Sequence, residues 1–555
     1  MGLFNYIIDK YMVVDGRRCL KKLFSDTVDP RRVNEKRLFD ILRLNKNSEY
    51  GKKYGFKNIH SVEQFRKQVP IVEYKDIEKE IERIYYNAES NVLASGKVIG
   101  FALSSGSVGK PKIIPKTEND IKNYTGYTIN RSFALADEYM RKTSGRGLKP
   151  ARGLFMLLNY DRFSPHGLRA SNVVDITSHK YYICYPSSLV VPLGRQYVTG
   201  EIDKNYALAR FSLEERNLLF IFYVFSKGIA EFIEYIKDNW ESLVDEIEKG
   251  TINPDVEMKD YIREKLQKVA ASNPVRAAEL RREFAKGFDE TILKRIWPNL
   301  SFISAIGSSA AFQPFTEAIK SYSKDIPFDY FTYASSEGIV GVSCKLDDPG
   351  QLLLPGSCYY EFIEEGDETQ TIHSIDELKL GKDYEIIMTN SSGFYRYRIN
   401  DVLRVVGFKN KCPIVLFMYR KGQLLNITGE KTNIEQMNEA VKRLEKETGV
   451  PIKEWTVYVD KGKDKYRYAI VLETENGDDL SGYSEAFDRY LIEINDLYEQ
   501  YKYMIDSPLI LAQKPGTHEA WKQKKIASGA TVDQVKPVKI LDTEEKKEFF
   551  LSRLC

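Results

Sequence analysis

Residues 104–112 read Ser-Ser-Gly-Ser-Val-Gly-Lys-Pro-Lys, so hydroxyl side chains, glycines and lysines fill most of this stretch. Apolar residues precede it at 101–103 and follow it at 113–114, which predicts a turn between two strands. The glycines permit positive φ and let backbone N–H groups converge on an anion, and the lysines add positive charge. The composition therefore favours a polyphosphate ligand. The order differs from the phosphate loop of mononucleotide-binding NTPases, and a surface hairpin with ordinary lysines is the alternative.

Length, charge and cysteine content exclude several classes of protein. A chain of 555 residues is too long for one compact core and predicts roughly two to four domains. Its 82 basic and 79 acidic residues give a net charge of +3, which argues against a nucleic-acid-binding protein. The six cysteines are scattered without metal-binding spacing, so we expect reduced thiols in a cytoplasmic protein.

The first 14 residues have neither a basic start nor a long apolar stretch. We therefore expect no signal peptide, no membrane span and no membrane partner. Abundant Lys, Ile, Asn and Tyr are typical of an AT-rich coding sequence and indicate a low-GC bacterium. We expect the protein to be a monomer.

Hydrophobic patterning predicts an α/β fold with two unequal domains. Residues 1–90 and 212–300 have helical spacing, whereas residues 301–406 alternate short apolar runs with polar turns, as strands of mixed sheets do. We predict a large N-terminal domain with mixed β-sheets and flanking helices at 1–419, a hinge at 420–431, and a small α+β domain at 432–555. In the small domain we expect two βαβ-like pieces, with these elements: a helix at 433–447, strands at 455–459 and 466–474, a long helix at 481–503 and further strands to 541.

Three further clusters carry chemistry. Residues 330–338 form an aromatic strand that ends in hydroxyls and one carboxylate, Glu337, which could bind Mg²⁺ through one oxygen while phosphates fill other positions. Helix capping by Ser336 is the alternative. In residues 393–402, Asp401 at the end of a strand could accept both ribose hydroxyls, and an arginine–carboxylate pair on a sheet is the alternative. Residues 420–431 contain a glycine between apolar runs, as a hinge requires.

Together and in this order, the four clusters resemble the motifs of the adenylate-forming superfamily. Within it, the chain is most similar to the Gretchen Hagen acyl acid-amido synthetases, enzymes that conjugate plant hormones to amino acids. Supporting matches are Tyr333-Ala-Ser-Ser-Glu337, Tyr395-Arg-Tyr-Arg398 and the ending from Lys514 to Pro537. The resemblance extends from about residue 100 to about residue 540.

The resemblance implies a role for each matching residue. Ser105, Gly106, Ser107, Gly109 and Lys112 would hold the β- and γ-phosphates of ATP, and Glu337 would bind Mg²⁺. Ser308 and Ser309 would line the adenine and acyl pockets, Tyr333 would stack on adenine, and Ser336 of the same motif would also bind the nucleotide. Asp401 would bind ribose, Arg420 would be the hinge arginine, and Lys536 would reach the α-phosphate. Lys536 and Lys112 would be the catalytic residues. Two positions depart from the family pattern: Val108 replaces a usual hydroxyl, and Glu430 precedes Lys431 where plant members read Asp-Lys.

The resemblance implies an ATP-dependent, Mg²⁺-dependent acyl acid-amido synthetase. A small carboxylic acid would attack the α-phosphorus of ATP to form acyl-AMP, and an amine, typically an amino acid, would then take the acyl group. One alternative is an acyl-CoA or carrier-protein ligase with a thiol acceptor. The other is an inactive relative that senses nucleotide or acyl ligands.

Overall fold

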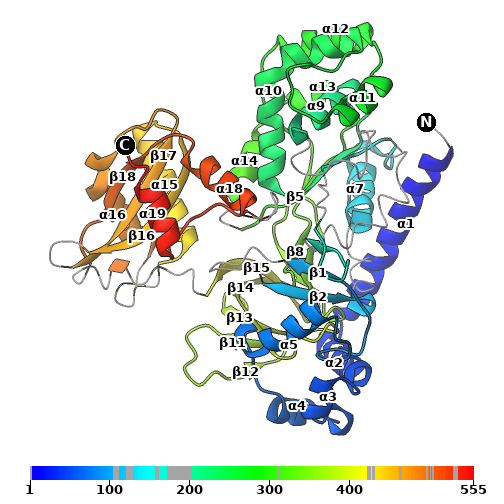
Figure 1. Cartoon of the computed structure of the whole chain (residues 1–555), viewed down its shortest axis with the longest axis vertical. Helices are drawn as coiled ribbons and strands as arrows, with labels where there is room; N and C mark the ends of the chain where they lie inside the picture. The colour runs from blue at the N-terminus through cyan, green and yellow to red at the C-terminus, as the bar shows by residue number, and fades with distance from the viewer. Residues whose placement is uncertain are drawn as a thin grey trace.

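The computed structural model describes most of the chain. The described residues are 3–103, 112–120, 129–149, 151–156, 162–171, 202–309, 312–421, 425, 427, 430, 432–461, 465–495, 498–499, 502, 505–528, 530 and 535–555. Figure 1 shows a large body, which carries the N-terminus of the chain, and beside it a smaller unit, which carries the C-terminus.

Helices dominate the first ninety residues, as the sequence predicts. They are α1 (Leu3–Asp26), α2 (Pro30–Asn45), α3 (Glu49–Lys53), the 3₁₀ turn η1 (Phe56–Asn58), α4 (Val62–Gln68) and α5 (Tyr74–Asn87). In α5 the helical spacing of Ile77, Ile81 and Ile84 puts all three on the buried face. Helix α1 packs along α7 (Ile129–Ser144), and Gly16 permits this approach because a Cβ there would stand 1.9 Å from the carbonyl oxygen of Asn130.

A small sheet carries the ends of the glycine-rich stretch. Strand β1 (Val98–Leu103) pairs antiparallel with β2 (Ile113–Thr117), with Leu103 opposite Ile113, and pairs parallel with β4 (Ala170–Ser171). The two predicted flanking strands are therefore confirmed. The turn itself, at 104–111, lies outside the described residues.

A parallel sheet forms the upper half of the body in Figure 1. Its order is β3 (Leu154–Phe155), β5 (Phe220–Phe225), β6 (Phe302–Ile306) and β7 (Phe328–Asp329). The prediction that 212–300 is entirely helical is wrong at β5, because a short run of aromatic and β-branched residues buried in a parallel sheet shows no alternation. The surrounding helices are α9 (Lys204–Glu214), α10 (Ser226–Lys249), α11 (Asp260–Val269), α12 (Pro274–Phe284), α13 (Ile292–Ile296) and α14 (Gln313–Ser321).

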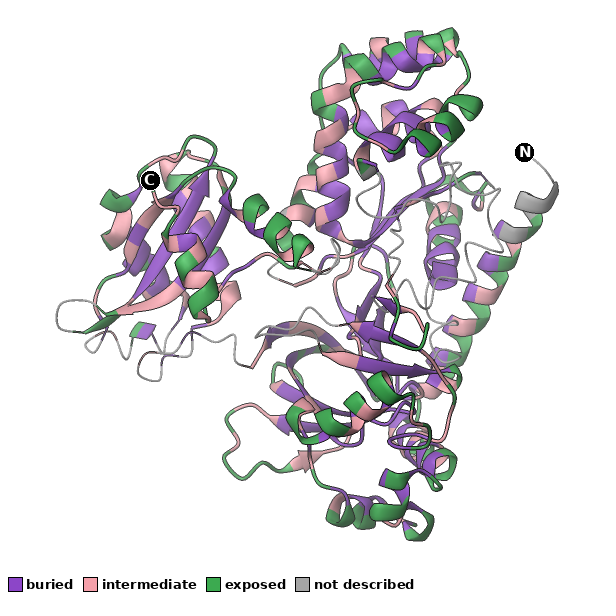
Figure 2. Cartoon of the chain, viewed as in Figure 1, coloured by how far each residue is buried: buried purple, intermediate pink, exposed green. Residues whose placement is uncertain are grey.

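An eight-stranded antiparallel sheet forms the lower half. Its order is β12-β11-β13-β14-β15-β10-β9-β8. The strands are β8 (Thr332–Ala334), β9 (Ile339–Ser343), β10 (Gln351–Leu353), β11 (Tyr359–Glu364), β12 (Ile372–His373), β13 (Asp383–Thr389), β14 (Tyr397–Lys409) and β15 (Cys412–Arg420). One continuous apolar core joins this sheet to α2–α5 and to the β1–β2 pair. Figure 2 shows the strands as the most buried part of the body.

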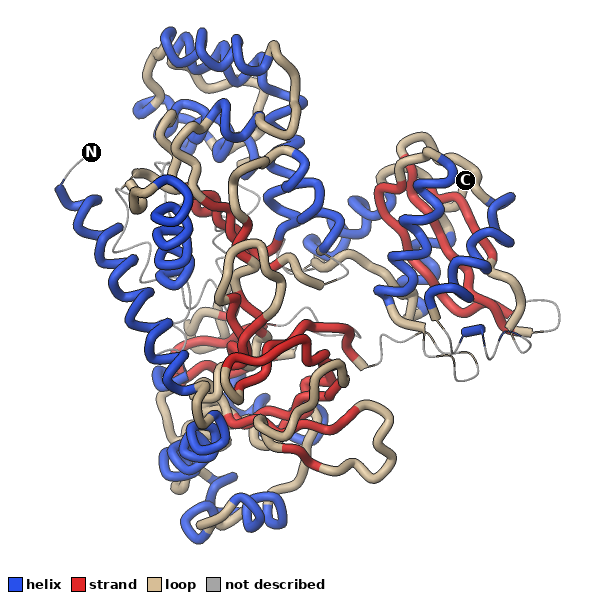
Figure 3. The backbone as a smooth tube through the Cα atoms, turned by 180° about the vertical axis from the view of Figure 1, so that it is seen from behind, coloured by secondary structure: helices blue, strands red, loops and turns tan. Residues whose placement is uncertain are grey.

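The C-terminal unit has its own apolar core and a three-stranded sheet. Its elements are α15 (Ile434–Thr448), β16 (Ile452–Lys461), β17 (Tyr466–Thr474), η4 (Ser481–Tyr483), α16 (Ser484–Ile494), β18 (Leu509–Gln513), α18 (Thr517–Ala527) and α19 (Glu544–Leu551). Figure 3 shows its helices packed around the strands from the reverse side. The α/β fold class with a small α+β C-terminal unit is therefore confirmed.

Three details of this unit differ from the predictions. Strands β17 and β18 are parallel and joined through α16, whereas β16 and β17 are antiparallel, so the described strands of this unit form one βαβ piece rather than two. Helix α16 ends at Ile494, because Asn495 turns extended. Residues 517–527 form the helix α18 rather than a strand, because Ala, Glu, Gln and Lys favour a helix there. The buried residues of α18 are Thr517 and Trp521, and two positions are too few to show the helical repeat of apolar residues in the sequence.

Ion pairs connect the C-terminal unit to the body. Glu454 of β16 accepts from Lys227 of α10 at 3.1 Å. Two further ion pairs join α18 to α10 and α15 to α14: Lys522–Glu231 at 3.1 Å and Lys442–Glu317 at 2.9 Å. No helix in the described part of the chain is both long and apolar enough to cross a membrane.

Candidate active site

Asp401 joins three strands of the eight-stranded sheet. It is 1% exposed and lies within β14, after Asn400, whose φ is +65°. Its Oδ2 accepts from the Tyr333 hydroxyl of β8 at 2.7 Å, and its Oδ1 accepts from Arg420 Nε at the end of β15 at 2.6 Å. The prediction that Asp401 ends a strand is wrong, because β14 continues through apolar residues to Lys409.

The charges around Asp401 reinforce these contacts. The Asp401 carboxylate raises the pKa of Arg420, so the guanidinium stays charged. Burial raises the pKa of the Tyr333 hydroxyl well above its usual value, and Asp401 raises it further, so Tyr333 donates. The arginine–carboxylate alternative is also present nearby, because Arg396 and Arg398 pair with the carboxylates of Glu361 and Glu385, at 2.8 and 3.0 Å respectively.

Glu337 lies in the tight turn between β8 and β9. The Ser335 N–H donates to the Gly338 carbonyl at 2.9 Å, and Ser335 Oγ accepts from the Glu337 N–H at 3.2 Å. Because this turn joins two antiparallel strands, the alternative that Ser336 caps a helix is wrong. Ser336 is half-buried and Glu337 is 7% exposed.

Lys112 follows directly after the glycine-rich turn and lies against two tyrosines. Its Nζ donates to the Tyr397 hydroxyl at 3.3 Å, and stands 5.4 Å from the ring centre of Tyr74. Burial raises the pKa of Tyr397, and the neighbouring Glu337 carboxylate raises it further. Tyr397 therefore contacts both Lys112 and Glu337, which brings the predicted phosphate-binding lysine and the predicted metal-binding carboxylate together.

Ser308 and Ser309 follow β6 at the carboxyl edge of the parallel sheet. The next strand in that sheet, β7, leads directly into residues 330–337. Because β6 and β7 are adjacent and parallel, the two serines and the Tyr333–Glu337 motif leave the sheet at the same edge, where open α/β sheets bind ligands. Both serines are half-buried.

Lys536 reaches this region from the C-terminal unit. Its charged neighbours are Arg420, Asp401 and Glu337, all on the body. The side chain of Lys536 is exposed at its own surface, although protein atoms surround it at longer range. Desolvation, followed by the charge of Arg420, lowers the pKa of Lys536 to about 8, although Asp401 and Glu337 act in the opposite direction.

The connector after Arg420 is anchored at both ends. Lys421 pairs with Glu385 at 2.8 Å on the body. Leu425 belongs to the C-terminal core, and Glu430 is buried there, where it accepts from the Ile427 N–H at 2.6 Å and from the Tyr468 hydroxyl. The chain thus passes from the body to the C-terminal unit between residues 421 and 425.

Some predicted positions lie outside the described residues. They are Ser105, Gly106, Ser107 and Gly109, together with residues 422–424, 426, 428–429 and 431 of the predicted hinge. In the described part of the chain, no cluster of three or more His, Cys, Asp or Glu side chains could hold a metal ion. We expect Glu337 to hold Mg²⁺ together with phosphate oxygens of a bound nucleotide, as hard cations sit on nucleotides.

Models of three GH3 family domains match the chain. The N-terminal domain model covers residues 19–328, the central domain model 351–420 and the C-terminal domain model 435–545. This chain belongs to the GH3 family. The predicted resemblance to the Gretchen Hagen family is confirmed.

Relatives and solved structures agree with this GH3 assignment. The indole-3-acetic acid-amido synthetase GH3.8 of Oryza sativa subsp. indica is 29% identical, over 91% of this chain and 87% of its own. The indole-3-acetic acid-amido synthetase GH3.4 of Arabidopsis thaliana is 28% identical, over 94% and 90%. The structure of the GH3.15 acyl acid amido synthetase matches with a TM-score of 0.81 at 24% identity, over 97% and 96%.

A 2-hydroxyisobutyryl-CoA ligase in the postadenylation state shares the fold more distantly, with a TM-score of 0.50 at 10% identity, over 93% of this chain and 90% of its own. The amido synthetase relatives confirm the predicted enzyme class, an amide-forming ligase, and the two solved structures confirm the predicted fold. The two relatives named above are plant proteins, so a bacterial origin stays a prediction.

The sequence did not single out several residues that shape the GH3 site. Tyr397 belongs to a motif that matches the family, but the resemblance implies no role for it, and no motif in the sequence marks Tyr74, Lys116 or Asn390. Tyr74 accepts from the Ile113 N–H at 2.9 Å, and so holds the base of β2. No local sequence pattern marks these four residues, because their partners are distant in sequence. The sequence points to β2 itself only because that strand directly follows Lys112.

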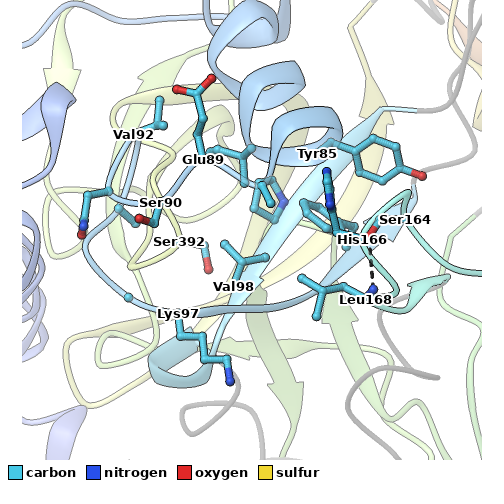
Figure 4. A pocket seen from close by; sticks show the side chains of 17 residues that line it. Tyr85, Glu89, Ser90, Val92, Lys97, Val98, Ser164, His166, Leu168 and Ser392 are labelled. Carbon is cyan, nitrogen blue, oxygen red and sulfur yellow. Dashed lines mark hydrogen bonds between the residues drawn. The ribbon is translucent and has the colours of Figure 1, made fainter.

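A pocket of about 170 Å³ has a lining that does not include Asp401, Glu337 or Lys536. Figure 4 shows its lining, which includes Tyr85, Lys97, His166 and Ser392. It lies near the start of β1, whereas residues 104–112 follow the end of that strand. Among the described residues, none of those predicted to bind the nucleotide lines it. We take the cluster of Asp401, Glu337 and Lys536 as the candidate active site.

Proposed function

We propose that this chain is an ATP-dependent acyl acid-amido synthetase that activates a carboxylic acid as acyl-AMP and transfers the acyl group to an amine. The observation that carries this proposal is the approach of Lys536 from the C-terminal unit to Asp401, Glu337 and Arg420 of the body. The names of the relatives, acid-amido synthetases, support an amine as the acceptor, and we propose an amino acid as that amine. The acid stays open, because no residue pattern around the site specifies its shape.

The residues divide the work of the first half-reaction. As the carboxylate attacks the α-phosphorus of ATP, negative charge grows on the equatorial oxygens and on the departing pyrophosphate. Lys536 would stabilise charge at the α-phosphate, while Lys112 and the backbone N–H groups of Ser105, Gly106, Ser107 and Gly109 would hold the β- and γ-phosphates. Ser308, Ser309, Tyr333 and Ser336 would border the adenine and acyl group, and Asp401 would accept the ribose hydroxyls.

Glu337 would hold Mg²⁺, which neutralises charge on the phosphates when it is bound. The chain's own part is to hold this carboxylate in place. The tight turn around Ser335 and the contact with Tyr397 fix its place, and burial limits its access to water.

We expect Glu337→Gln to weaken Mg²⁺-dependent turnover and leave the fold intact, because one isosteric change removes the charge without creating a cavity. The Mg²⁺ concentration at half-maximal pyrophosphate exchange should rise at least about tenfold, the scale for losing one charged ligand. Thermal unfolding of both proteins is the control. An unchanged Mg²⁺ titration would return Glu337 to a structural role.

The second half-reaction requires a different arrangement of the two units. An amine must reach the acyl carbonyl while AMP leaves, and Lys536 occupies that region in this conformation. We propose that residues 1–419 and the C-terminal unit swivel about the connector 420–431. Arg420 and Lys421 are held by Asp401 and Glu385, and Leu425 is packed into the other core, so the motion would centre between residues 421 and 425.

The acceptor separates the amido synthetase from the thiol alternative. We expect the enzyme, given an acid that supports pyrophosphate exchange, to form product with an amino acid and not with coenzyme A. A screen of carboxylic acids by pyrophosphate release, with mixed amino acids or with coenzyme A, measures this directly. Consumption of acid with coenzyme A alone would establish the ligase instead.

Pyrophosphate exchange with any acid would also exclude an inactive sensor. Each charged position matched to the site carries a competent residue: Lys112, Glu337, Asp401, Arg420 and Lys536. We further propose a bacterial, cytoplasmic, monomeric enzyme, on the amino-acid composition and the dispersed cysteines.

A further inference from the structure

A buried polar cluster lies beneath the Glu337 turn, and the mechanism above does not use it. Its members are Lys116, Thr117, Asp120, Asn390 and Ser392, each at most 2% exposed. Lys116 Nζ pairs with Asp120 Oδ2 at 2.7 Å. A buried ammonium is costly unless it is paired and bonded, so this one is held at its place by the fold.

The cluster bonds to the peptide carbonyl of Glu337. Lys116 Nζ donates to this oxygen at 3.3 Å, and Asn390 Nδ2 donates to it at 2.9 Å. Asn390 is itself oriented, because its Oδ1 accepts from the N–H groups of Ser392 and Phe394 at 3.0 and 3.2 Å. The carbonyl group of Glu337 therefore accepts hydrogen bonds from two donors, Lys116 and Asn390, that lie outside its own turn.

These bonds connect three segments that bear nucleotide-site residues. Lys116 lies on β2, the strand that follows Lys112. Asn390 lies in the turn before β14, the strand of Tyr397 and Asp401. Thr117 ties the first two segments together, since its N–H donates to Ser392 Oγ at 3.2 Å. The phosphate-binding strand, the Glu337 turn and the ribose-binding strand therefore meet at one buried cluster.

We propose that Lys116 is a positioning residue that couples the phosphate-binding strand to the Glu337 carboxylate, and so sets the affinity of the enzyme for magnesium-bound ATP. This inference rests on the proposed function. A carboxylate on a turn is free to rotate unless its peptide is fixed, and a charged donor on the carbonyl fixes it more strongly than a neutral one. Movement of β2 when phosphates bind would reach Glu337 through this ammonium.

The test removes the charges as a pair. Lys116→Met alone would leave Asp120 buried and unpaired, which by itself destabilises a fold. The variant Lys116→Met/Asp120→Asn avoids this. We expect isothermal titration calorimetry to show magnesium-bound ATP bound about tenfold more weakly, as for loss of one charge-assisted hydrogen bond. Binding of ATP in the presence of EDTA should change by less than about twofold.

A matched control exists in α9. Arg210 is fully buried, pairs with Glu214 four residues later at 2.7 Å, and donates to the Glu246 carbonyl at 3.1 Å. The variant Arg210→Met/Glu214→Gln should lower thermal stability by a similar amount and leave both titrations unchanged. Loss of magnesium-bound ATP affinity in this control as well would reduce the effect to general destabilisation and overturn the inference.

Two further outcomes decide the inference. Combined with Glu337→Gln, the Lys116/Asp120 change should have little additional effect, because both act through one carboxylate. If the Lys116/Asp120 change lowered the affinity for magnesium-bound ATP equally with Glu337 and with Gln at position 337, Lys116 would act elsewhere and the inference would be overturned. Failure of the unmodified protein to bind ATP with or without Mg²⁺ would instead overturn the proposed function, and this inference with it.

Discussion

Lys536→Ala will slow acyl-adenylate formation by about two to three orders of magnitude, the scale for losing one electrostatic contact to a transition state. ATP will still bind, because the other predicted nucleotide contacts lie on the body. We expect this effect because Lys536 belongs to the C-terminal unit and interacts electrostatically with Asp401, Glu337 and Arg420 of the body. Pyrophosphate exchange measures the rate, and calorimetry measures ATP binding.

The pH profile gives this prediction a second readout. The pKa of Lys536 is lowered to about 8, so in the free enzyme the ammonium is present below that pH and is lost above it. The value of kcat/KM for ATP should therefore fall above about pH 8, and Lys536→Arg should keep its activity, though lower, through that range, because guanidinium stays charged.

Lys524→Ala serves as the control for this substitution. Lys524 lies on α18 and pairs with Glu545 at 3.1 Å within the C-terminal unit, so its loss should change adenylation little. A near-normal rate for Lys536→Ala would contradict the assignment and transfer the role to Lys514 or Lys524.

Glu454→Gln will slow adenylation by about a hundredfold and leave amide formation from supplied acyl-AMP within about threefold. Glu454 accepts from Lys227 of the body at 3.1 Å and from Lys539 of its own unit at 3.0 Å. Burial opposes its ionisation, but Lys539 and Lys227 together hold the pKa of Glu454 below its usual range. Without the carboxylate, two ammonium groups would face each other, and breaking such a pair costs about 3–5 kcal/mol.

We expect that cost to fall on the conformation in which Lys536 meets the body, because Lys227 of the body and Lys539 of the C-terminal unit both contact Glu454 in it, and a swivel would separate them. Glu317→Gln is the control, since its pair with Lys442 is exposed and worth little. The measurements are pyrophosphate exchange and, separately, product formation from synthetic acyl-AMP. Equal loss of both half-reactions in Glu454→Gln would remove the support for a two-state swivel.

Local patterns predicted the framework of the site because each motif is continuous in sequence. The apolar residues around 104–112 indicate β1 and β2, and Tyr333 to Glu337 end a strand that the structure contains. The Mg²⁺-binding, ribose-binding and phosphate-binding roles came from family resemblance, and they stay predictions that the substitutions above test.

The remainder depends on contacts that no short stretch encodes. Lys116 and Asn390 are 274 positions apart, yet both donate to the Glu337 carbonyl. Strand β5 and helix α18 were assigned to the wrong class, because neither shows the alternation or period of its type. Glu430 looked like a departure from the family pattern, and only the buried Tyr468 hydroxyl reveals its place in the C-terminal core.

The carboxylate of Asp401 has a consequence for how the connector and the nucleotide are related. Its two oxygens each accept one hydrogen bond, from Tyr333 and from Arg420. An ionised carboxylate offers about four acceptor positions, so each oxygen can accept a further bond from a ribose hydroxyl. The sugar of a bound nucleotide and the residue at the start of the connector would then share one carboxylate, and the sugar would lie one side chain away from the segment about which the C-terminal unit turns.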